Sequence, residues 1–218
     1  MQNSVVINQQ LVAYNVLNQE SKKALVFLHG WRSQGLVWKD IAEKISNQGF
    51  AVYMLDLPGF GGSPQPKSAF SVQDYADVVA EFIKKLKLNN IILIGHSFGG
   101  RVAIKLSAVY SNLIEKIVLV DSAGLAENRS KGTGFLAKVA KPFFKPSFMR
   151  GLREKIYKKI GAEDYVATPQ LKETFLKVIN EDLSDYLAQI NKPTLIIWGE
   201  NVKDTALMVA KIMNEKIK

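Results

Sequence analysis

Ser97 stands in a run whose residue types and spacing suit nucleophilic chemistry. It lies between Gly95 and Gly99 in the pattern G-x-S-x-G. A β-branched apolar run, 91–94, precedes it, and apolar residues at helical spacing follow Gly100, so the stretch predicts a strand, a sharp turn and a helix with the serine at the apex. Glycines are expected on both sides because the backbone of so tight a turn passes too close for a Cβ. The pattern favours a serine nucleophile over a glycine-rich turn with an incidental serine.

Two backbone N–H groups are candidates for binding negative charge beside this serine. The helix predicted to begin at Phe98 points its first N–H and its positive end toward the place where charge would develop. A second strand candidate, 24–28, ends in His29-Gly30-Trp31. The Trp31 N–H can then face the first donor from the other side, which makes a two-donor oxyanion hole. We interpret His29 as a residue that braces this loop through hydrogen bonds, in preference to a catalytic histidine.

The elements that must position these residues alternate along the chain. Residues 4–7 and 11–17 predict an antiparallel hairpin at one sheet edge, and the continuous apolar run 24–28 predicts a strand covered on both faces. Further strands are expected at residues 49–55, 91–94, 116–120 and 194–198, and further helices at residues 38–46, 71–86 and 205–217. This order predicts an α/β protein with a mostly parallel sheet, helices on both faces and a site at the carboxyl ends of the strands. Asp56 and Asp121 also fall at such ends, and we interpret Asp56 as structural.

Composition limits the kinds of protein this can be. The chain has 218 residues, of which 47% are hydrophobic, enough for one core or for a core with a modest insertion. No apolar run approaches the roughly 20 residues of a membrane helix, and the first residues lack the features of a secretory signal, so a cytoplasmic protein is expected. The absence of cysteine excludes disulfides and thiolate chemistry, and two histidines are too few for a histidine-based metal cluster. We therefore expect neither a metal nor a cofactor.

The net charge of +9 is concentrated in one stretch. Residues 129–160 carry ten Lys or Arg against one acid, Glu154, so the rest of the chain is neutral, with 29 − 10 = 19 basic and 20 − 1 = 19 acidic residues. Such a cluster can mark an anionic partner, but no nucleic-acid-binding motif accompanies it. We interpret it as a solvated helical surface with an apolar inner face, and no nucleic-acid partner is expected.

Four motifs, in order and spacing, resemble those of the α/β-hydrolase superfamily, in the cap-bearing branch of esterases and carbon–carbon bond hydrolases. The matching residues are His29-Gly30-Trp31, residues 56–63, residues 95–100 and residues 193–200. The resemblance implies that Ser97 is the nucleophile. It also implies a hydrolase core in residues 1–124 and 189–218, with a basic helical cap in residues 125–188.

The sequence departs from this family at two catalytic positions. Serine hydrolases need a histidine base near the carboxyl terminus, but no histidine follows His96. The resemblance implies a further strand, a Gly-His turn and a final helix beyond the last residue. The family's acid stands three residues after a glycine that ends the last strand, and here Val202 follows Gly199 at that spacing. Asp204 is the candidate that could reach the same place, and Asp121 is a weaker alternative.

Three functions remain open from the sequence. The first is a serine hydrolase that acts on small esters or related carbon–carbon substrates and whose general base is missing from this chain. The second is a binding module that keeps the pocket and has lost turnover. The third is an anion-surface binder, which only the charge supports. If no further strand follows, residues 194–198 form an exposed sheet edge through which the chain could associate with itself.

Overall fold

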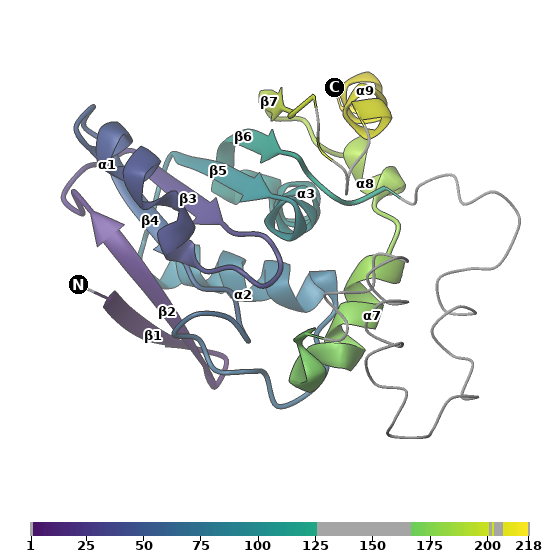
Figure 1. The fold of residues 1–218 in the computed structure, drawn as a ribbon. Coiled ribbons are helices and arrows are strands. Elements are labelled where there is room, and N and C mark those ends of the chain that lie inside the picture. Colours follow the sequence, from purple (N-terminus) through teal and green to yellow (C-terminus); the bar gives the residue numbers. More distant parts are fainter. Residues whose placement is uncertain (1, 126–166, 201, 203–206, 218) are drawn as a thin grey trace, which may run out of the picture.

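A seven-stranded sheet organises the protein (Figure 1). The computed structural model describes residues 2–125, 167–200, 202 and 207–217. The strands are β1 Gln2–Ile7, β2 Gln10–Leu17, β3 Ala24–Leu28, β4 Ala51–Leu55, β5 Ile91–His96, β6 Ile114–Val120 and β7 Thr194–Ile197. Their order in the sheet is β1-β2-β4-β3-β5-β6-β7. β2 is antiparallel to both β1 and β4, and every other neighbouring pair is parallel, which confirms the predicted mostly parallel sheet with an amino-terminal hairpin.

Helices cover both faces of the sheet, as the sequence predicted (Figure 1). The helices that the structure describes are η1 Gly35–Trp38, α1 Lys39–Ser46, α2 Val72–Lys85, α3 Phe98–Val109, η2 Ser111–Leu113, η4 Pro169–Leu171, α7 Lys172–Asn180, α8 Ser184–Leu187 and α9 Leu207–Lys216. Within the described residues, no helix is long and apolar enough to cross a membrane.

The central strands are buried on both faces, and their alternate side chains enter two separate cores. On β3, Ala24, Val26 and Leu28 pack into the larger cluster with α2 and α3. Leu25 and Phe27 point the other way, into a smaller cluster beside α1. This alternation follows from the two-residue period of a strand and explains why the sequence of β3 is apolar throughout.

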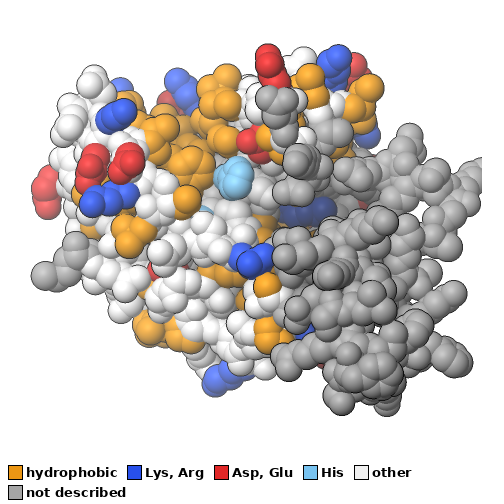
Figure 2. Space-filling model, viewed as in Figure 1, with side chains coloured by type: hydrophobic (Ala, Val, Ile, Leu, Met, Phe, Trp, Pro, Cys, Tyr) orange, Lys and Arg blue, Asp and Glu red, His pale blue; other side chains and the backbone are white. Residues whose placement is uncertain are grey.

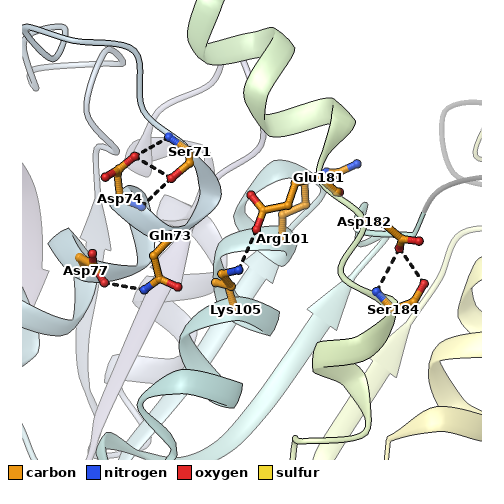
Figure 3. Close-up of polar contacts among 9 residues, drawn as sticks. All are labelled: Ser71, Gln73, Asp74, Asp77, Arg101, Lys105, Glu181, Asp182 and Ser184. Atoms are coloured by element: carbon orange, nitrogen blue, oxygen red, sulfur yellow. Dashed lines mark hydrogen bonds and ion pairs between the residues drawn. The ribbon is translucent and has the colours of Figure 1, made fainter. Parts of the chain in front are cut away.

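α2 begins where its sequence predicts, at Ser71. The Asp74 N–H donates to the Ser71 hydroxyl at 3.3 Å, and the Ser71 N–H donates to the Asp74 carboxylate at 2.6 Å (Figure 3). This reciprocal capping box satisfies N–H groups that the first helical turn cannot pair, and such a cap is worth about 1 kcal/mol. The buried face of α2 includes Tyr75 and Phe82, both fully inside the core. The cap and the apolar stripe therefore fix both the start and the rotation of the helix.

Some strand boundaries differ from the expected ones, and most of the predicted cap lies outside the described residues. The strand expected at 49–55 begins at Ala51 instead, because Gly49 has a φ of +86° and belongs to the turn before it. The strand expected at 116–120 begins two residues earlier, at Ile114. Most of the cap predicted for 125–188, including the whole basic stretch 129–160, lies outside the described residues. Its last part is helical, in η4, α7 and α8.

Candidate active site

Ser97 occupies the junction between β5 and α3 in a strained backbone conformation. Its φ is +49° and its ψ is −109°, a region that residues with a side chain rarely adopt. Two hydrogen bonds to the end of β6 hold it there: the Ser97 N–H donates to the Val120 carbonyl at 3.1 Å, and the Ala123 N–H donates to the Ser97 carbonyl at 3.2 Å. The half-buried Ser97 hydroxyl has no hydrogen-bond partner among the described residues.

The glycines around Ser97 permit contacts that any side chain would block. A Cβ on Gly95 would collide with the carbonyl of Gly99, and a Cβ on Gly99 would collide with the carbonyl of Leu28 at the end of β3. The second contact brings the start of α3 directly against the strand that leads into the Trp31 loop. This is the close backbone approach that the G-x-S-x-G spacing predicts.

The loop after β3 reaches Ser97. A Cβ placed on Gly30 would lie 3.6 Å from the Ser97 Cβ. The rings of Trp31 and Phe98 meet edge to face with their centroids 5.1 Å apart. No hydrogen bond from the backbone N–H of Trp31 or of Phe98 to a described residue is present. The backbone N–H groups of Trp31, in the loop after β3, and of Phe98, at the start of α3, are therefore not paired with a described residue.

His29 braces this loop, as interpreted from the sequence. Its side chain is fully buried. The Leu57 N–H donates to Nε2 at 3.0 Å, so the ring proton of the neutral form is on Nδ1, which donates to the Gly30 carbonyl at 2.7 Å. Burial lowers the pKa of His29, and the hydrogen bond to Gly30 and the charge of Asp56 only partly oppose this. Both ring nitrogens are engaged, so His29 links the Trp31 loop to the loop after β4.

Asp56 is structural, also as interpreted. One carboxylate oxygen accepts the Gly35 N–H at 2.6 Å, and the other accepts the Gly62 N–H at 2.8 Å and the side-chain amide of Gln2 at 3.0 Å. The Ser63 hydroxyl donates to the Asp56 carbonyl at 2.6 Å. Asp56 therefore holds together the segments that contain Gln2, Gly35 and Gly62.

Sequence reasoning missed the residues that hold Trp31 from the other side of the site. The Trp31 indole N–H donates to the Thr168 hydroxyl at 3.3 Å, and the Phe175 ring of α7 lies 5.2 Å from the Trp31 ring. The rings of Phe60 and Phe98 complete an aromatic wall, at 4.9 and 5.1 Å from Trp31. The contact with Thr168 spans 137 residues of sequence, so no local pattern could have indicated it.

A second missed feature ties the segment between α7 and α8 to the helix that follows Ser97. Arg101 and Lys105 lie one turn apart on α3, both nearly fully buried. Arg101 donates to the Glu181 carbonyl at 2.8 Å, and the Lys105 ammonium lies 2.7 Å from the Glu181 carboxylate (Figure 3). The Lys105 ammonium also lies 3.7 Å from the centre of the Tyr186 ring. The sequence feature that could have indicated this interaction is the pair of basic residues, Arg101 and Lys105, four positions apart in an otherwise apolar helix.

The acid and base positions are the incomplete part of the site. Asp204, the candidate acid, lies outside the described residues. Asp121 follows β6 with a φ of +43°, and its carboxylate accepts the Gly199 N–H at 2.8 Å, so it braces the ends of β6 and β7. His96 is half-buried with its ring against Gly30. Burial lowers the pKa of His96, and the charge of Asp121 partly opposes the shift.

The arrangement can support addition of a serine hydroxyl to a carbonyl group. It supplies a half-buried serine hydroxyl on a tight turn, with the backbone N–H of Phe98 and the loop that carries Trp31 next to it in the fold. Among the described residues, no group of three His, Asp or Glu side chains could hold a metal ion.

Comparison with known proteins gives consistent matches. A family model described as "alpha/beta hydrolase fold" matches residues 23–159. The "AB hydrolase superfamily protein YisY" of Bacillus subtilis is 26% identical over 215 residues, which cover 90% of this chain and 80% of that protein. The "2-(acetamidomethylene)succinate hydrolase" of Mesorhizobium japonicum is 31% identical over 110 residues, or 50% of this chain and 39% of that enzyme. Among solved structures, the esterase EaEST of Exiguobacterium antarcticum superposes with a TM-score of 0.77 at 22% identity. The match covers 100% of this chain and 88% of the esterase chain, and it shows a similarity of fold.

Proposed function

The chain belongs to the α/β-hydrolase superfamily, and on that basis we propose that it forms the site of a serine hydrolase for small esters or related acyl and carbon–carbon substrates. In this proposal Ser97 is the nucleophile. The N–H groups of Trp31 and Phe98 bind the oxyanion. His29, Gly30, Gly95 and Gly99 support that geometry, and residues 125–188 form a cap over it. The relatives named 2-(acetamidomethylene)succinate hydrolase and putative esterase/lipase 2 favour this reaction class.

The observation that carries the proposal is the strained conformation of Ser97. A φ of +49° at a residue with a side chain costs on the order of 1–3 kcal/mol and persists only where the surroundings hold it. Here the bonds to Val120 and Ala123 hold it, and the result is a hydroxyl that projects from the end of β5. A serine incidental to a glycine-rich turn would gain nothing from that strain, because glycine would fit the same turn without it.

The general base is the part that this chain does not provide in the described site. His29 has both ring nitrogens in hydrogen bonds, and His96 stands beside the nucleophile with its ring against Gly30. Loss of one triad member lowers turnover by on the order of 10⁴ to 10⁶. We therefore expect slow hydrolysis by the 218-residue chain. As the acid we propose Asp204, with Asp121 as the weaker alternative because its carboxylate already accepts the Gly199 N–H.

The aromatic wall favours substrates with an apolar acyl group. The rings of Phe60, Phe98 and Phe175 each contact the ring of Trp31, whose loop reaches Ser97 at Gly30. In this proposal the apolar substituent of a carbonyl substrate packs against this aromatic cluster. No cofactor takes part in this chemistry.

A binding module that retains the pocket without turnover is the alternative. It is favoured by Val202, which stands at the spacing where the family resemblance places the acid. The two functions differ in whether Ser97 reacts at all once a base is supplied.

Imidazole rescue of ester hydrolysis tests the proposal. The wild-type chain and Ser97→Ala are assayed with 4-nitrophenyl acetate and 4-nitrophenyl butyrate, with and without imidazole. We expect a low Ser97-dependent rate that imidazole raises well above the imidazole-catalysed rate seen with Ser97→Ala. Equal rates for the two proteins at every imidazole concentration, together with saturable binding of the ester, would favour the binding module.

A further inference from the structure

Two buried cations of α3 hold the carboxyl-terminal end of α7. Glu181 follows the last residue of this helix and has an extended backbone, with a φ of −75° and a ψ of 119°. Arg101 donates to the Glu181 carbonyl at 2.8 Å, and the Lys105 ammonium lies 2.7 Å from the Glu181 carboxylate (Figure 3). The last carbonyls of a helix lack partners within it, and positive charge is favourable near them. Arg101 and Lys105 therefore cap α7 from another helix.

Burial makes these contacts demanding. Figure 2 shows several Lys and Arg side chains that project from the surface of the protein, whereas Arg101 and Lys105 are only 8% and 4% exposed. A buried charge that loses its partner is very costly, so Lys105 must keep the carboxylate close. One contact is to the backbone of Glu181 and the other is to its side chain. Held at two points, Glu181 can neither shift along α3 nor turn about a single bond.

The other end of the same segment contacts the loop after β3. The Trp31 indole N–H donates to the Thr168 hydroxyl at 3.3 Å, and the ring of Phe175, on α7, lies 5.2 Å from the ring of Trp31. The last turns of α7 join Phe175 to Glu181, and a packed helix moves as a rigid element. A displacement at Glu181 would therefore also displace the Phe175 ring against Trp31.

Two further hydrogen bonds attach α7, and both are of weaker kinds. The Phe70 N–H donates to the Thr174 hydroxyl at 3.1 Å, and the Lys177 ammonium donates to the Ala69 carbonyl at 2.8 Å. The first joins two neutral groups, and the second is exposed, where water competes for the ammonium group. A buried hydrogen bond between charged groups is stronger than either. The pair at Glu181 is thus the polar contact expected to control the position of α7.

We propose that Glu181 is a positioning residue: its pairing with Lys105 holds α7 so that Phe175 and Thr168 keep Trp31 in place. This inference rests on the proposed function, in which the Trp31 N–H binds the oxyanion and the rings around Trp31 receive the acyl group. An apolar contact in place of the ion pair can keep the protein stable but does not fix α7, because such contacts have no preferred direction. Glu181 is then held only at its carbonyl, about which the end of α7 can turn.

A single-tryptophan protein makes the position of Trp31 measurable apart from catalysis. The chain contains three tryptophans, so Trp38→Phe and Trp198→Phe together leave Trp31 as the only source of tryptophan fluorescence. Acrylamide quenching of that fluorescence reports how closely the surrounding groups pack on the indole. Imidazole-assisted hydrolysis of 4-nitrophenyl acetate and 4-nitrophenyl butyrate gives the acyl preference, with Ser97→Ala in the same background as the blank. Urea unfolding gives the stability.

Four variants in this background separate position from stability. Lys105→Met combined with Glu181→Met replaces the ion pair by an apolar contact, and Glu181→Met alone leaves Lys105 unpaired. Glu181→Gln keeps an oxygen acceptor for Lys105 but removes the charge. Lys177→Met, on α7 itself, removes an ammonium group whose hydrogen bond is exposed, and it is the matched control.

The double variant and Glu181→Gln should behave in opposite ways. The double variant should keep the urea midpoint of the background protein, yet its quenching constant should rise by about twofold and its preference for butyrate over acetate should fall by about threefold. Glu181→Gln should unfold at a lower urea concentration but retain the quenching and the acyl preference of the background protein. Lys177→Met should also retain both, and Glu181→Met should match the double variant in quenching.

Unchanged quenching in the double variant would overturn the proposal. So would equal quenching for Glu181→Met and Glu181→Gln, a comparison that holds even where the double variant does not fold. Quenching that changes as expected, with no hydrolysis above the Ser97→Ala blank in any protein, would support the positioning role of Glu181 and contradict the proposed serine chemistry.

Discussion

The buried ion pair between Lys105 and Glu181 should contribute far more to stability than a surface pair of the same length. The Lys105 and Glu181 charges lie 2.7 Å apart, with side chains 5% and 24% exposed. The charges of Lys84 and Glu81 on α2 are also 2.7 Å apart, but those side chains are 47% and 43% exposed. The two pairs differ mainly in burial, so they isolate its effect.

The expected losses are unequal for the two partners. Glu181→Met leaves the Lys105 ammonium buried without its carboxylate, which should lower the free energy of unfolding by about 3 kcal/mol. This is the lower end of the range for breaking a buried ion pair, and we choose it because Glu181 itself is partly exposed. Lys105→Met leaves Glu181 able to meet water and should cost about 1–2 kcal/mol. The double variant should be more stable than Glu181→Met alone, since no buried charge remains unpaired.

Urea unfolding at neutral pH measures these values, with Lys84→Met as the matched control, expected to change stability by about 0.5 kcal/mol or less. Neutral pH suits the assay because the pKa of Lys105 is raised. Burial acts to lower it, but the hydrogen bond and charge of Glu181 and the contact with Tyr186 prevail. The contribution of the pair is therefore complete below the ordinary lysine pKa and is lost only as the pH rises through the raised value. Equal losses for Lys105→Met and Lys84→Met would refute the reasoning.

Three further outcomes follow from the site. Ser97→Gly should be about 1 kcal/mol more stable to urea than Ser97→Ala, because glycine accepts the positive φ without strain; equal midpoints would mean that the turn is relaxed. Burial lowers the pKa of His29, so the folded state resists protonation, and the free energy of unfolding should fall as the pH drops below about 6.5, by at most about 1.4 kcal/mol per pH unit. His29→Gln should flatten this part of the pH profile measured by urea unfolding. An unchanged slope would contradict the assignment of this pH dependence to His29. Thr168→Val removes the acceptor for the Trp31 indole N–H and should lower imidazole-assisted ester turnover by about fivefold. Thr174→Val, which removes the hydroxyl that accepts the Phe70 N–H, is the control and should leave turnover unchanged. Equal effects of the two variants would show that the position of Trp31 does not affect the reaction.

Local patterns sufficed where the controlling interactions are local. The G-x-S-x-G turn follows from steric demands within a few residues, and the start of α2 follows from Ser71 and Asp74, three residues apart. The two-face burial of β3 follows from its unbroken apolar sequence. The hydrogen-bonding roles interpreted for His29 and Asp56 agree with their contacts, because a polar side chain at the end of a buried strand can pair with the backbone N–H and C=O groups of the adjoining turns.

Contacts between distant segments were beyond such reasoning. Nothing near Trp31 indicates that Thr168 and Phe175 hold its ring, and nothing near Lys105 identifies Glu181 as its partner. These contacts depend on how the segment 168–187 crosses the ends of the strands, a consequence of the whole fold. The acid at Asp204 and the cap remain predictions.

The most direct test of the central claim is the site and rate of phosphonate labelling. The wild-type chain is incubated with a fluorophosphonate at neutral pH, the mass of the intact protein is followed with time, and the modified peptide is sequenced by mass spectrometry. We predict a single adduct, on Ser97, that forms slowly and faster when imidazole is added, because the proposed site has a nucleophile and oxyanion donors but no general base among the described residues. An adduct on another serine, or none after long incubation with imidazole, would contradict the assignment of Ser97; rapid labelling without imidazole would show that His29 or His96 serves as the base.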